Sequence, residues 1–139
     1  MNQPKRLQSV IIPYKIKNGK VFVFLQKRSA TAKRAPNKIG FFGGHIEPGE
    51  TKEQALVREI KEELNYSLQE YKFLDSFEFA RSIRITFYMK APDDFEDKIE
   101  VLEGDYGKYF SEEEAEKEPN IIEEDRTVLK RFFEEIKKL

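Results

Sequence analysis

The sequence predicts an α/β fold in which a β-sheet lies between helices. Short segments rich in β-branched and aromatic residues recur along the chain, as is typical of strands. Two longer segments, 52–64 and 122–138, carry apolar residues at helical spacing. Turn-forming residues separate these segments, and a chain of 139 residues has the size of one ordinary domain, so we expect a single domain over residues 1–139. The pattern does not determine the strand order.

The N-terminal part is predicted to form a β-hairpin, a loop and a short strand. Residues 8–14 and 20–26 are rich in β-branched and aromatic side chains, and Lys17-Asn18-Gly19 between them is typical of a hairpin turn. Residues 27–38 are basic and rich in turn formers, which indicates a loop. We expect a short strand over 39–42, directly before two glycines.

The segment 52–64 carries the start and stop signals of a helix. Thr51 followed by Gln54 forms a capping box, and Asn65 tolerates the left-handed conformation that ends many helices. The apolar residues of this helix form a stripe beside a set of carboxylates, not beneath them. The stripe consists of Leu56, Ile60 and Leu64. The helix can therefore dock on a core while its carboxylates face a cleft.

The middle of the chain is predicted to add a second pair of strands. Residues 69–79 and 82–90 have the composition of strands, and the turn between them falls near Ala80-Arg81. Residues 91–97 are acidic and contain Pro92, which indicates a loop.

The C-terminal part is predicted to contain a late strand and two helices. The strand covers 106–110, and Ser111 with the glutamates after it begins a short acidic helix. Pro119-Asn120 breaks that helix, and residues 122–138 form a last amphipathic helix. Its apolar residues are Val128, Leu129, Phe132, Phe133 and Ile136.

The composition excludes several classes of function. The net charge of −1 gives no electrostatic basis for binding nucleic-acid polymers or anionic membranes, although 37% of the residues are charged. The absence of cysteine rules out disulfides, thiolate metal sites and thiol nucleophiles. No apolar run approaches the roughly 20 residues that span a bilayer. We expect a soluble, cytoplasmic protein.

Glu59, Glu62 and Glu63 are the most informative residues of the chain. On a helix, spacings of three and four place side chains on one face, with Cβ atoms about 5–6 Å apart. Carboxylates this close repel each other, which a cation relieves, and oxygen ligands favour Mg²⁺ or Mn²⁺ over Zn²⁺. The alternative is a solvated acidic helix face. Gly43-Gly44 and Pro48-Gly49, which allow close backbone approach and a turn, favour the metal site.

The run from Gly44 to Tyr66 resembles the Nudix box, whose pattern is G-x5-E-x7-R-E-U-x-E-E-x-G-U, with U a bulky apolar residue. Asn65 replaces a glycine and Tyr66 an aliphatic residue, and neither departure touches the acidic side chains. The resemblance implies a Nudix α/β/α sandwich with a mixed β-sheet between helices, and Mg²⁺ or Mn²⁺ as cofactor. The matching residues are Gly44, Glu50, Arg58, Glu59, Ile60, Glu62 and Glu63.

The resemblance also implies a role for each charged residue of the box. Glu59, Glu62 and Glu63 are the expected metal ligands. Glu50 is expected to bind the metal or to support those ligands. Arg58 is expected to orient a carboxylate through its guanidinium fork, with Glu50 or Glu59 as the partner.

A later acidic segment supplies one more candidate. Residues 102–105, Leu-Glu-Gly-Asp, resemble the Glu-Gly segment that precedes a late strand in MutT-like members of the family, where an additional carboxylate often lies. Glu103 is therefore the candidate general base or additional metal ligand. Asp105 and Glu100 are the alternatives if the alignment shifts, and an acidic loop without function is the plain alternative.

Substrate-binding residues are expected on both sides of the box. Arg28 lies where MutT-like enzymes place a phosphate-contacting arginine. Gly43 and Gly44 bring the backbone close to a ligand, and the resemblance suggests a carbonyl there for a metal. Asn120 lies near the place of a base-reading asparagine, although asparagine after proline is also ordinary turn chemistry. His45, the only histidine, is expected to be a surface residue.

The resemblance to MutT-like members implies hydrolysis of an ordinary or oxidised nucleoside triphosphate to the monophosphate and pyrophosphate. Dinucleoside polyphosphates, nucleotide sugars and ADP-ribose are alternative substrates, and a non-catalytic nucleotide-binding Nudix module is the alternative class. The diagnostic Tyr or Pro that some relatives carry after the box is absent from Ser82-Ile83-Arg84. The expected partner is a small nucleotide, with no nucleic-acid polymer or membrane, and the protein is expected to be a monomer or homodimer.

Overall fold

The computed structural model describes residues 4–138, so residues 1–3 and 139 of the predicted domain lie outside it. The strands are β1 (Arg6–Lys17), β2 (Lys20–Lys27), β3 (Ile39–Gly40), β4 (Phe42–His45), β5 (Lys72–Glu78), β6 (Ser82–Lys90) and β7 (Tyr106–Ser111). The helices are α1 (Lys52–Leu64), α2 (Phe95–Lys98), α3 (Glu112–Lys117) and α4 (Glu123–Ile136).

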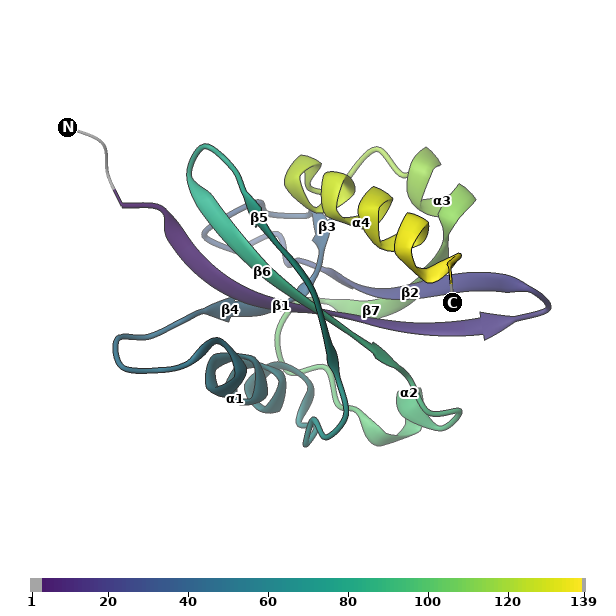
Figure 1. Ribbon diagram of the computed structural model, residues 1–139, viewed down its shortest axis with the longest axis horizontal. Coiled ribbons are helices and arrows are strands. Elements are labelled where there is room, and N and C mark those ends of the chain that lie inside the picture. Colours follow the sequence, from purple (N-terminus) through teal and green to yellow (C-terminus); the bar gives the residue numbers. More distant parts are fainter. Residues whose placement is uncertain (1–3, 139) are drawn as a thin grey trace.

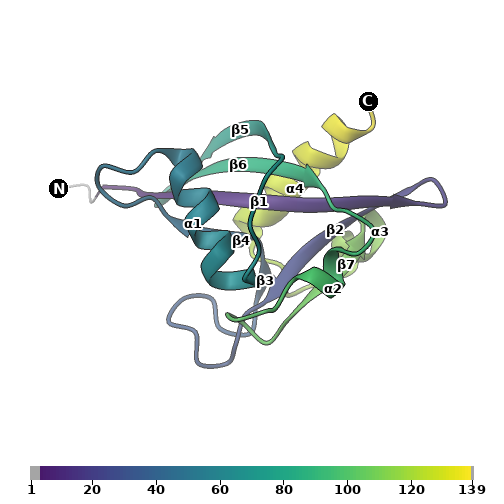
Figure 2. The same ribbon diagram turned by 90° about the horizontal axis from the view of Figure 1, so that it is seen from below.

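The strands form one mixed sheet that is sandwiched between helices (Figure 1). β1 lies in the middle, and β6 pairs with it in parallel. The other pairings are antiparallel, namely β1 with β2 and β4, β2 with β3 and β7, and β5 with β6. Figure 2 shows α1 in front of the sheet, on the face opposite α4. The predicted α/β/α sandwich with a mixed sheet is confirmed.

Strand β1 is buried on both faces, which explains its continuous apolar run. Val10 and Ile12 belong to the core cluster that contains the apolar face of α4. Ile11 between them belongs to the cluster that contains the stripe of α1, because successive side chains of a strand point to opposite faces. The central strand therefore contributes to the packing of α1 on one side of the sheet and of α4 on the other.

The hairpin turn and the caps of α1 agree with the predictions from sequence. Asn18 and Gly19 both have a positive φ, 53° and 75°, which the tight turn between twisted strands requires. Thr51 and Gln54 make both hydrogen bonds of the capping box, and Asn65 ends α1 with a φ of 49°. Local signals thus determine where α1 begins and ends, and with this the direction of its carboxylates.

Three local predictions were wrong. The single strand expected over 39–42 is interrupted at Phe41, because β3 pairs with β2 whereas β4 pairs with β1. The short helix α2 overlaps the end of the expected loop 91–97, since the buried ring of Phe95 anchors it. β5 starts at Lys72 and not at 69, because the chain before it buries Leu68 in the core beside α1.

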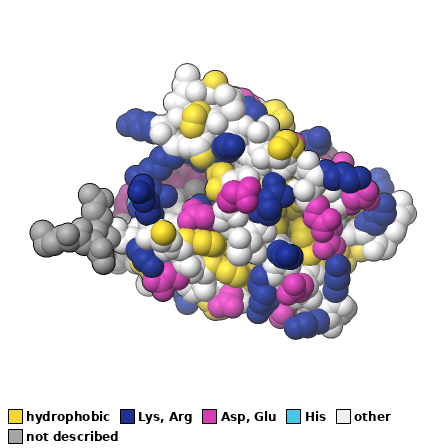
Figure 3. Space-filling view, turned by 90° about the horizontal axis from the view of Figure 1, so that it is seen from above, with side chains coloured by type: hydrophobic (Ala, Val, Ile, Leu, Met, Phe, Trp, Pro, Cys, Tyr) yellow, Lys and Arg dark blue, Asp and Glu magenta, His cyan; other side chains and the backbone are white. Residues whose placement is uncertain are grey.

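The surface over α3 and α4 carries interspersed basic and acidic side chains (Figure 3). This mixture of both signs agrees with the net charge of −1. Among residues 4–138, no helix is long and apolar enough to cross a membrane.

Candidate active site

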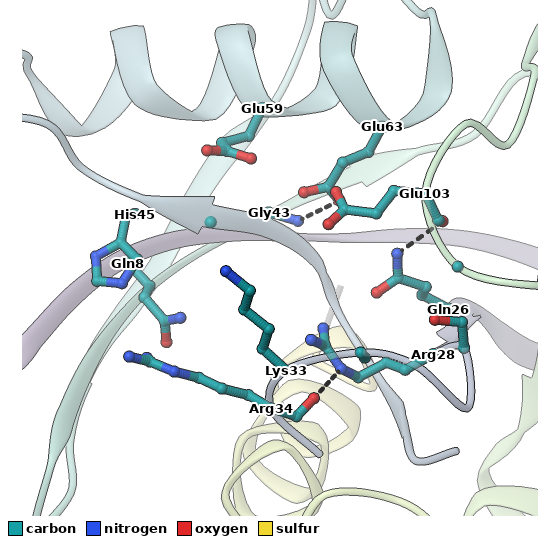
Figure 4. Close-up of a pocket in the computed structure, with 14 residues that line it drawn as sticks. Gln8, Gln26, Arg28, Lys33, Arg34, Gly43, His45, Glu59, Glu63 and Glu103 are labelled. Atoms are coloured by element: carbon teal, nitrogen blue, oxygen red, sulfur yellow. Dashed lines mark hydrogen bonds between the residues drawn. The ribbon is translucent and has the colours of Figure 1, made fainter. Parts of the chain in front are cut away.

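A pocket of about 470 Å³, which we call the carboxylate pocket, lies between α1 and the loop that follows β2. Helix α1 contributes Glu59 and Glu63, and the loop before β7 contributes Glu103 (Figure 4). Gly43 and Gly44 of β4 form part of its wall. The fold therefore brings residues from distant parts of the chain to one site.

Glycine at position 44 makes room for Glu59. A Cβ atom at Gly44 would lie 2.6 Å from the carboxyl carbon of Glu59, closer than side chains pack. At Gly43 a Cβ would lie 2.2 Å from the carbonyl oxygen of Ser9, and φ is 139°, which favours glycine. Glycine at position 43 therefore allows β4 to pack against the backbone of β1, and glycine at position 44 leaves space for the carboxylate of Glu59.

Glu63 is the buried acid of the pocket. The residue is 3% exposed, and its Oε1 accepts a hydrogen bond from the backbone N–H of Gly43 at 3.0 Å. Burial raises the pKa of Glu63 well above its usual range, against the effect of that hydrogen bond, and the charges of Glu103 and Glu59 raise it further. The pocket therefore favours the neutral form of this carboxyl group unless a cation stabilises its charge.

Arg58 connects the parts of the acidic run. Its Nε and Nη2 atoms donate to Oε2 and Oε1 of Glu50 at 2.7 and 3.0 Å, and its Nη1 donates to Oε1 of Glu59 at 2.8 Å. Its Nη2 also donates to the carbonyl of His45 at 2.9 Å. The hydrogen bonds from Arg58 lower the pKa of Glu50 to about 2. Arg58 therefore orients Glu59, and it uses both partners that the sequence suggested.

Glu50 and Glu62, both expected at a metal, do not line the carboxylate pocket. Glu50 is held by the two-point pair with Arg58. Glu62 lies one turn beyond Arg58 on α1, its side chain is 58% exposed, and its Oε2 is 3.4 Å from Nη1 of Arg58. The physical reason is the same for both, because the guanidinium group draws these carboxylates to itself. Of the five predicted ligands, the structure brings Glu59, Glu63 and Glu103 together.

Glu103 lines the pocket, and its two alternatives are engaged elsewhere. Asp105 accepts a hydrogen bond from Nζ of Lys27 at 2.8 Å. Glu100 accepts one from the side-chain amide of Asn65 at 3.3 Å. The structure therefore favours Glu103 over Asp105 and Glu100, a choice that spacing alone left open.

The end of β2 fixes the loop that carries Glu103. Gln26 is 3% exposed, and its Nε2 donates to the carbonyl of Glu103 at 2.9 Å. A Cβ at Gly104 would lie 2.8 Å from the carbonyl of Lys27, and φ there is 87°. Gln26 was not among the site residues predicted from the sequence. The available signal was a polar residue placed directly after the apolar strand run Val-Phe-Val-Phe-Leu.

Three cations face the carboxylates across the pocket. Arg28, directly after β2, and Lys33 and Arg34 of the next loop line the side opposite α1 (Figure 4). Nε of Arg28 donates to the carbonyl of Arg34 at 2.9 Å, which holds this loop in shape. Arg28, the predicted phosphate-binding residue, therefore lies at the pocket with both loop cations beside it.

Asn120 lies outside the pocket, whereas His45 lines it. The exposed Asn120 donates its backbone N–H to Oε2 of Glu118 at 3.0 Å, and its carbonyl accepts from the N–H of Ile39 at 3.0 Å. These bonds form the turn between α3 and α4, which is the ordinary turn chemistry expected after Pro119. Asn120 therefore lies in a turn outside the pocket, and its role in substrate binding stays a prediction.

The donor set fits a hard divalent ion in its chemistry. Glu59, Glu63 and Glu103 offer only oxygen atoms, and a cation among them would offset the burial and the repulsion that together raise the pKa of Glu63. Within residues 4–138, no three acidic or histidine side chains stand in an arrangement that could hold a metal ion as they are. These carboxylates would therefore have to rotate toward a bound ion.

The protein class follows from comparison with known proteins. The NUDIX domain family matches residues 5–132, so the chain belongs to the Nudix family. It is 36% identical over 97 residues to the 8-oxo-dGTP diphosphatase of Escherichia coli (strain K12), which covers 69% of this chain and 74% of that protein. The family match and this relative support the prediction of an enzyme, a pyrophosphohydrolase acting on phosphoric anhydride bonds.

Solved structures share the fold. A mutT/nudix family protein from Listeria innocua has a TM-score of 0.80 at 24% identity, over 98% of this chain and 96% of that chain. The NUDIX domain of Shewanella oneidensis NrtR, solved with ADP ribose, has a TM-score of 0.74 at 14% identity, over 96% and 90% of the two chains. The family generally uses a divalent metal ion.

Proposed function

We propose that this protein hydrolyses a nucleoside triphosphate to the nucleoside monophosphate and pyrophosphate, with Mg²⁺ or Mn²⁺. The observation that carries the proposal is the two-sided carboxylate pocket, in which three carboxylates face three cations. A polyphosphate chain needs both sides, because cations bind its oxygens directly and carboxylates bind them through metal ions. The diphosphatase relative supports a nucleoside triphosphate as the substrate, and an oxidised one as the first to test.

The basic side of the pocket would bind and orient the substrate. Guanidinium groups donate two parallel hydrogen bonds to phosphate oxygens, so Arg28 and Arg34 would fix the chain while Lys33 adds a mobile charge. Cleavage of a phosphoric anhydride depends mostly on positioning and on neutralising charge. The basic loop would therefore supply much of the binding energy.

The acidic side of the pocket would hold the metal ion and accept the proton of the attacking water. Glu59, Glu63 and Glu103 would hold the ion, which when bound neutralises charge on phosphate oxygens and activates a water molecule. Arg58 keeps Glu59 in one orientation through a hydrogen bond of 2.8 Å. Glu103 is the candidate to accept the proton of the attacking water, because Gln26 fixes the backbone of its loop and its carboxylate faces the pocket.

The experiment is product release from a substrate panel with and without Mg²⁺. The panel contains ordinary and 8-oxo deoxynucleoside triphosphates, diadenosine tetraphosphate, ADP-ribose and GDP-mannose. Glu63→Gln is the inactive control, and Glu70→Gln is the matched control, since Glu70 is an exposed acid outside the carboxylate pocket. We expect the monophosphate and pyrophosphate from one triphosphate, in the wild type and in Glu70→Gln only.

Other results would change the proposal in defined ways. Turnover of diadenosine tetraphosphate, a nucleotide sugar or ADP-ribose in preference to every triphosphate would replace the substrate and keep the chemistry. Binding of a nucleotide without turnover of any panel member would make the non-catalytic module the better account.

A further inference from the structure

Asn65 and Tyr66, the two departures from the box pattern, both contact one segment of the chain. The side-chain amide of Asn65 donates to Oε1 of Glu100 at 3.3 Å. The ring of Tyr66 meets the buried ring of Phe95 edge to face, with 5.2 Å between the ring centroids. We call residues 95–103, which begin with α2, the connecting segment. Both departures thus contact the segment whose last residue is a carboxylate of the pocket.

The backbone of the connecting segment completes the end of α1. The N–H of Glu100 donates to the carbonyl of Leu64 at 2.9 Å, and the N–H of Leu102 donates to the carbonyl of Glu63 at 2.8 Å. The last carbonyls of a helix have no partner within the helix, so these bonds stabilise both segments. Leu102 directly precedes Glu103, so the pocket acid of the loop is tied to the turn of α1 that carries Glu63.

The side chains of the connecting segment alternate between core and solvent. Ile99 and Val101 pack against the core cluster that contains the apolar stripe of α1. Glu100 and Leu102, which lie next to them, are exposed. The hydrogen bond from Asn65 therefore holds the exposed side of the segment at its middle, while the ring of Tyr66 holds its start.

The end of α1 does not itself require an asparagine. Asn65 has a φ of 49°, and glycine adopts this conformation without steric cost. An aliphatic side chain at position 66 could fill the same core space, but it could not make the contact between two rings. What Asn65 and Tyr66 add to the box pattern is therefore their contact with the connecting segment.

We propose that Asn65 and Tyr66 are positioning residues, which hold Glu103 at the carboxylate pocket through the connecting segment. The proposal rests on the proposed function, because it assumes that Glu103 acts on the attacking water or on the metal ion. A reacting group that shifts by about 1 Å can lose much of its effect on the rate. Asn65 and Tyr66 therefore act on kcat through Glu103, and not on the binding of phosphate by the basic loop.

The test restores the residue types of the box pattern. Asn65→Gly and Tyr66→Leu are assayed with the best substrate of the panel, and circular dichroism confirms that each variant is folded. We expect each to lower kcat by about 3–10-fold, as the loss of one hydrogen bond or one ring pair does, and to leave KM nearly unchanged.

The chain offers a matched control for each variant. Asn18→Gly makes the same change at an exposed asparagine with a φ of 53°, in the hairpin turn between β1 and β2. Tyr71→Leu makes the same change in the core cluster of Tyr66, where the ring of Tyr71 meets that of Phe87 edge to face at 5.5 Å. We expect both controls to retain the kcat of the wild type.

Two further comparisons separate a positioning role from a merely structural one. In the Glu103→Gln background, Asn65→Gly and Tyr66→Leu should no longer lower kcat, because the group that they position is gone. Asn65→Asp places a carboxylate against Glu100 and should lower kcat. Adding Glu100→Gln restores a donor and an acceptor in reversed order, and should recover most of the loss.

Each other outcome overturns a defined statement. Wild-type kcat in Asn65→Gly and Tyr66→Leu would overturn the proposal and leave the proposed function intact. Equal losses with and without Glu103→Gln, or wild-type kcat in Glu103→Gln itself, would overturn the action through Glu103. Failure of Glu100→Gln to rescue Asn65→Asp would overturn the role of their hydrogen bond. Absence of nucleotide turnover in the wild type would contradict the proposed function, and the positioning role with it.

Discussion

Arg58 and Glu50 form a two-point ion pair, with distances of 2.7 Å from Nε to Oε2 and 3.0 Å from Nη2 to Oε1. The same guanidinium group reaches Glu59 at 2.8 Å, so Glu50 anchors the arginine that orients a carboxylate of the pocket. A planar guanidinium group can serve two carboxylates at once, whereas an ammonium group is a single point charge. The orientation of Glu59 is therefore coupled to Glu50, a residue outside the pocket.

Arg58→Lys should fold and lose activity. The lysine keeps the charge but not the fork, so Glu59 is no longer held, and we expect kcat/KM to fall by about 10–100-fold. Arg131→Lys is the matched control, because Arg131 pairs with Glu135 and Asp75 away from the pocket. Steady-state kinetics with the best panel substrate gives the result. Equal activity of both variants would show that the fork does not matter.

The acidic residues of α1 should differ in their importance. Glu59 and Glu63 line the pocket, so Glu59→Gln and Glu63→Gln should each lower kcat by roughly 10²–10⁴-fold. Glu62 is exposed, and within residues 4–138 its ion-pair partner is Arg58 at 3.4 Å, so Glu62→Gln should cost at most about 10-fold, as an exposed ion pair does. A loss in Glu62→Gln as large as in the other two would mean that Glu62 turns into the pocket on metal binding.

Gly44→Ala should lower activity because the added methyl group takes the space that the side chain of Glu59 occupies. The new Cβ would lie 2.6 Å from the carboxyl carbon of Glu59 and force that side chain out of place. We expect kcat to fall by about 10²-fold or more, as for a misplaced catalytic group, with little change in the far-ultraviolet circular dichroism spectrum. Retained activity would mean that Glu59 can shift without consequence.

The parts of the fold that follow from sequence are those with local causes. The capping box of Thr51 and Gln54 and the positive φ of Asn18 depend only on neighbouring residues, so their positions could be predicted. The break at Phe41 could not, because it follows from two different partner strands for β3 and β4. The parallel pairing of β1 with β6 likewise depends on packing between distant segments.

The residues of the site divide in the same way, into those predicted from local spacing and those placed by contacts between distant segments. Spacing on α1 predicts that Glu59 and Glu63 share a face, and both line the pocket. Spacing does not predict that Glu62 leaves that face, because its direction depends on where the side chain of Arg58 lies. The position of Gln26 depends on a loop that passes over β2 much later in the chain. The motif therefore identifies the acidic residues, and tertiary contacts determine which of them lie together in the pocket.

Asp125 should make stability depend on pH. Burial raises its pKa from the ordinary 3.8 to about 6, although the charge of Arg84 opposes the rise. Between these values the folded protein binds more protons at this group than the unfolded chain, so the free energy of unfolding falls as the pH rises. The contribution of Asp125 is thus largest below pH 4 and is lost by about pH 6.

Asp125→Asn removes this titration and serves as the reference. The free energy of unfolding of the wild type minus that of Asp125→Asn should decrease by about 3 kcal/mol from about pH 4 to about pH 6. Urea unfolding at several pH values measures it, and the subtraction cancels the other titrating groups. A difference that stays constant or increases with pH would contradict the raised pKa.

Lys27 should control the distance between the two sides of the carboxylate pocket. Its Nζ donates to Oδ2 of Asp105 at 2.8 Å, to the carbonyl of Arg28 at 3.0 Å and to Oδ1 of Asn37 at 3.2 Å. These contacts join the loop of Glu103 to the basic loop. Removing the ammonium group therefore frees both loops at once.

Lys27→Met should lower kcat/KM by about 10–100-fold, the usual effect of losing a residue that supports a site. Lys38→Met is the matched control, since Lys38 is an exposed lysine of the same basic segment and only its backbone takes part in hydrogen bonds that join the loop. The two variants lose the same charge, so a general electrostatic effect would lower kcat/KM equally in both. A loss confined to Lys27→Met would instead show that its cause is the loss of the hydrogen bonds by which Lys27 joins the two loops.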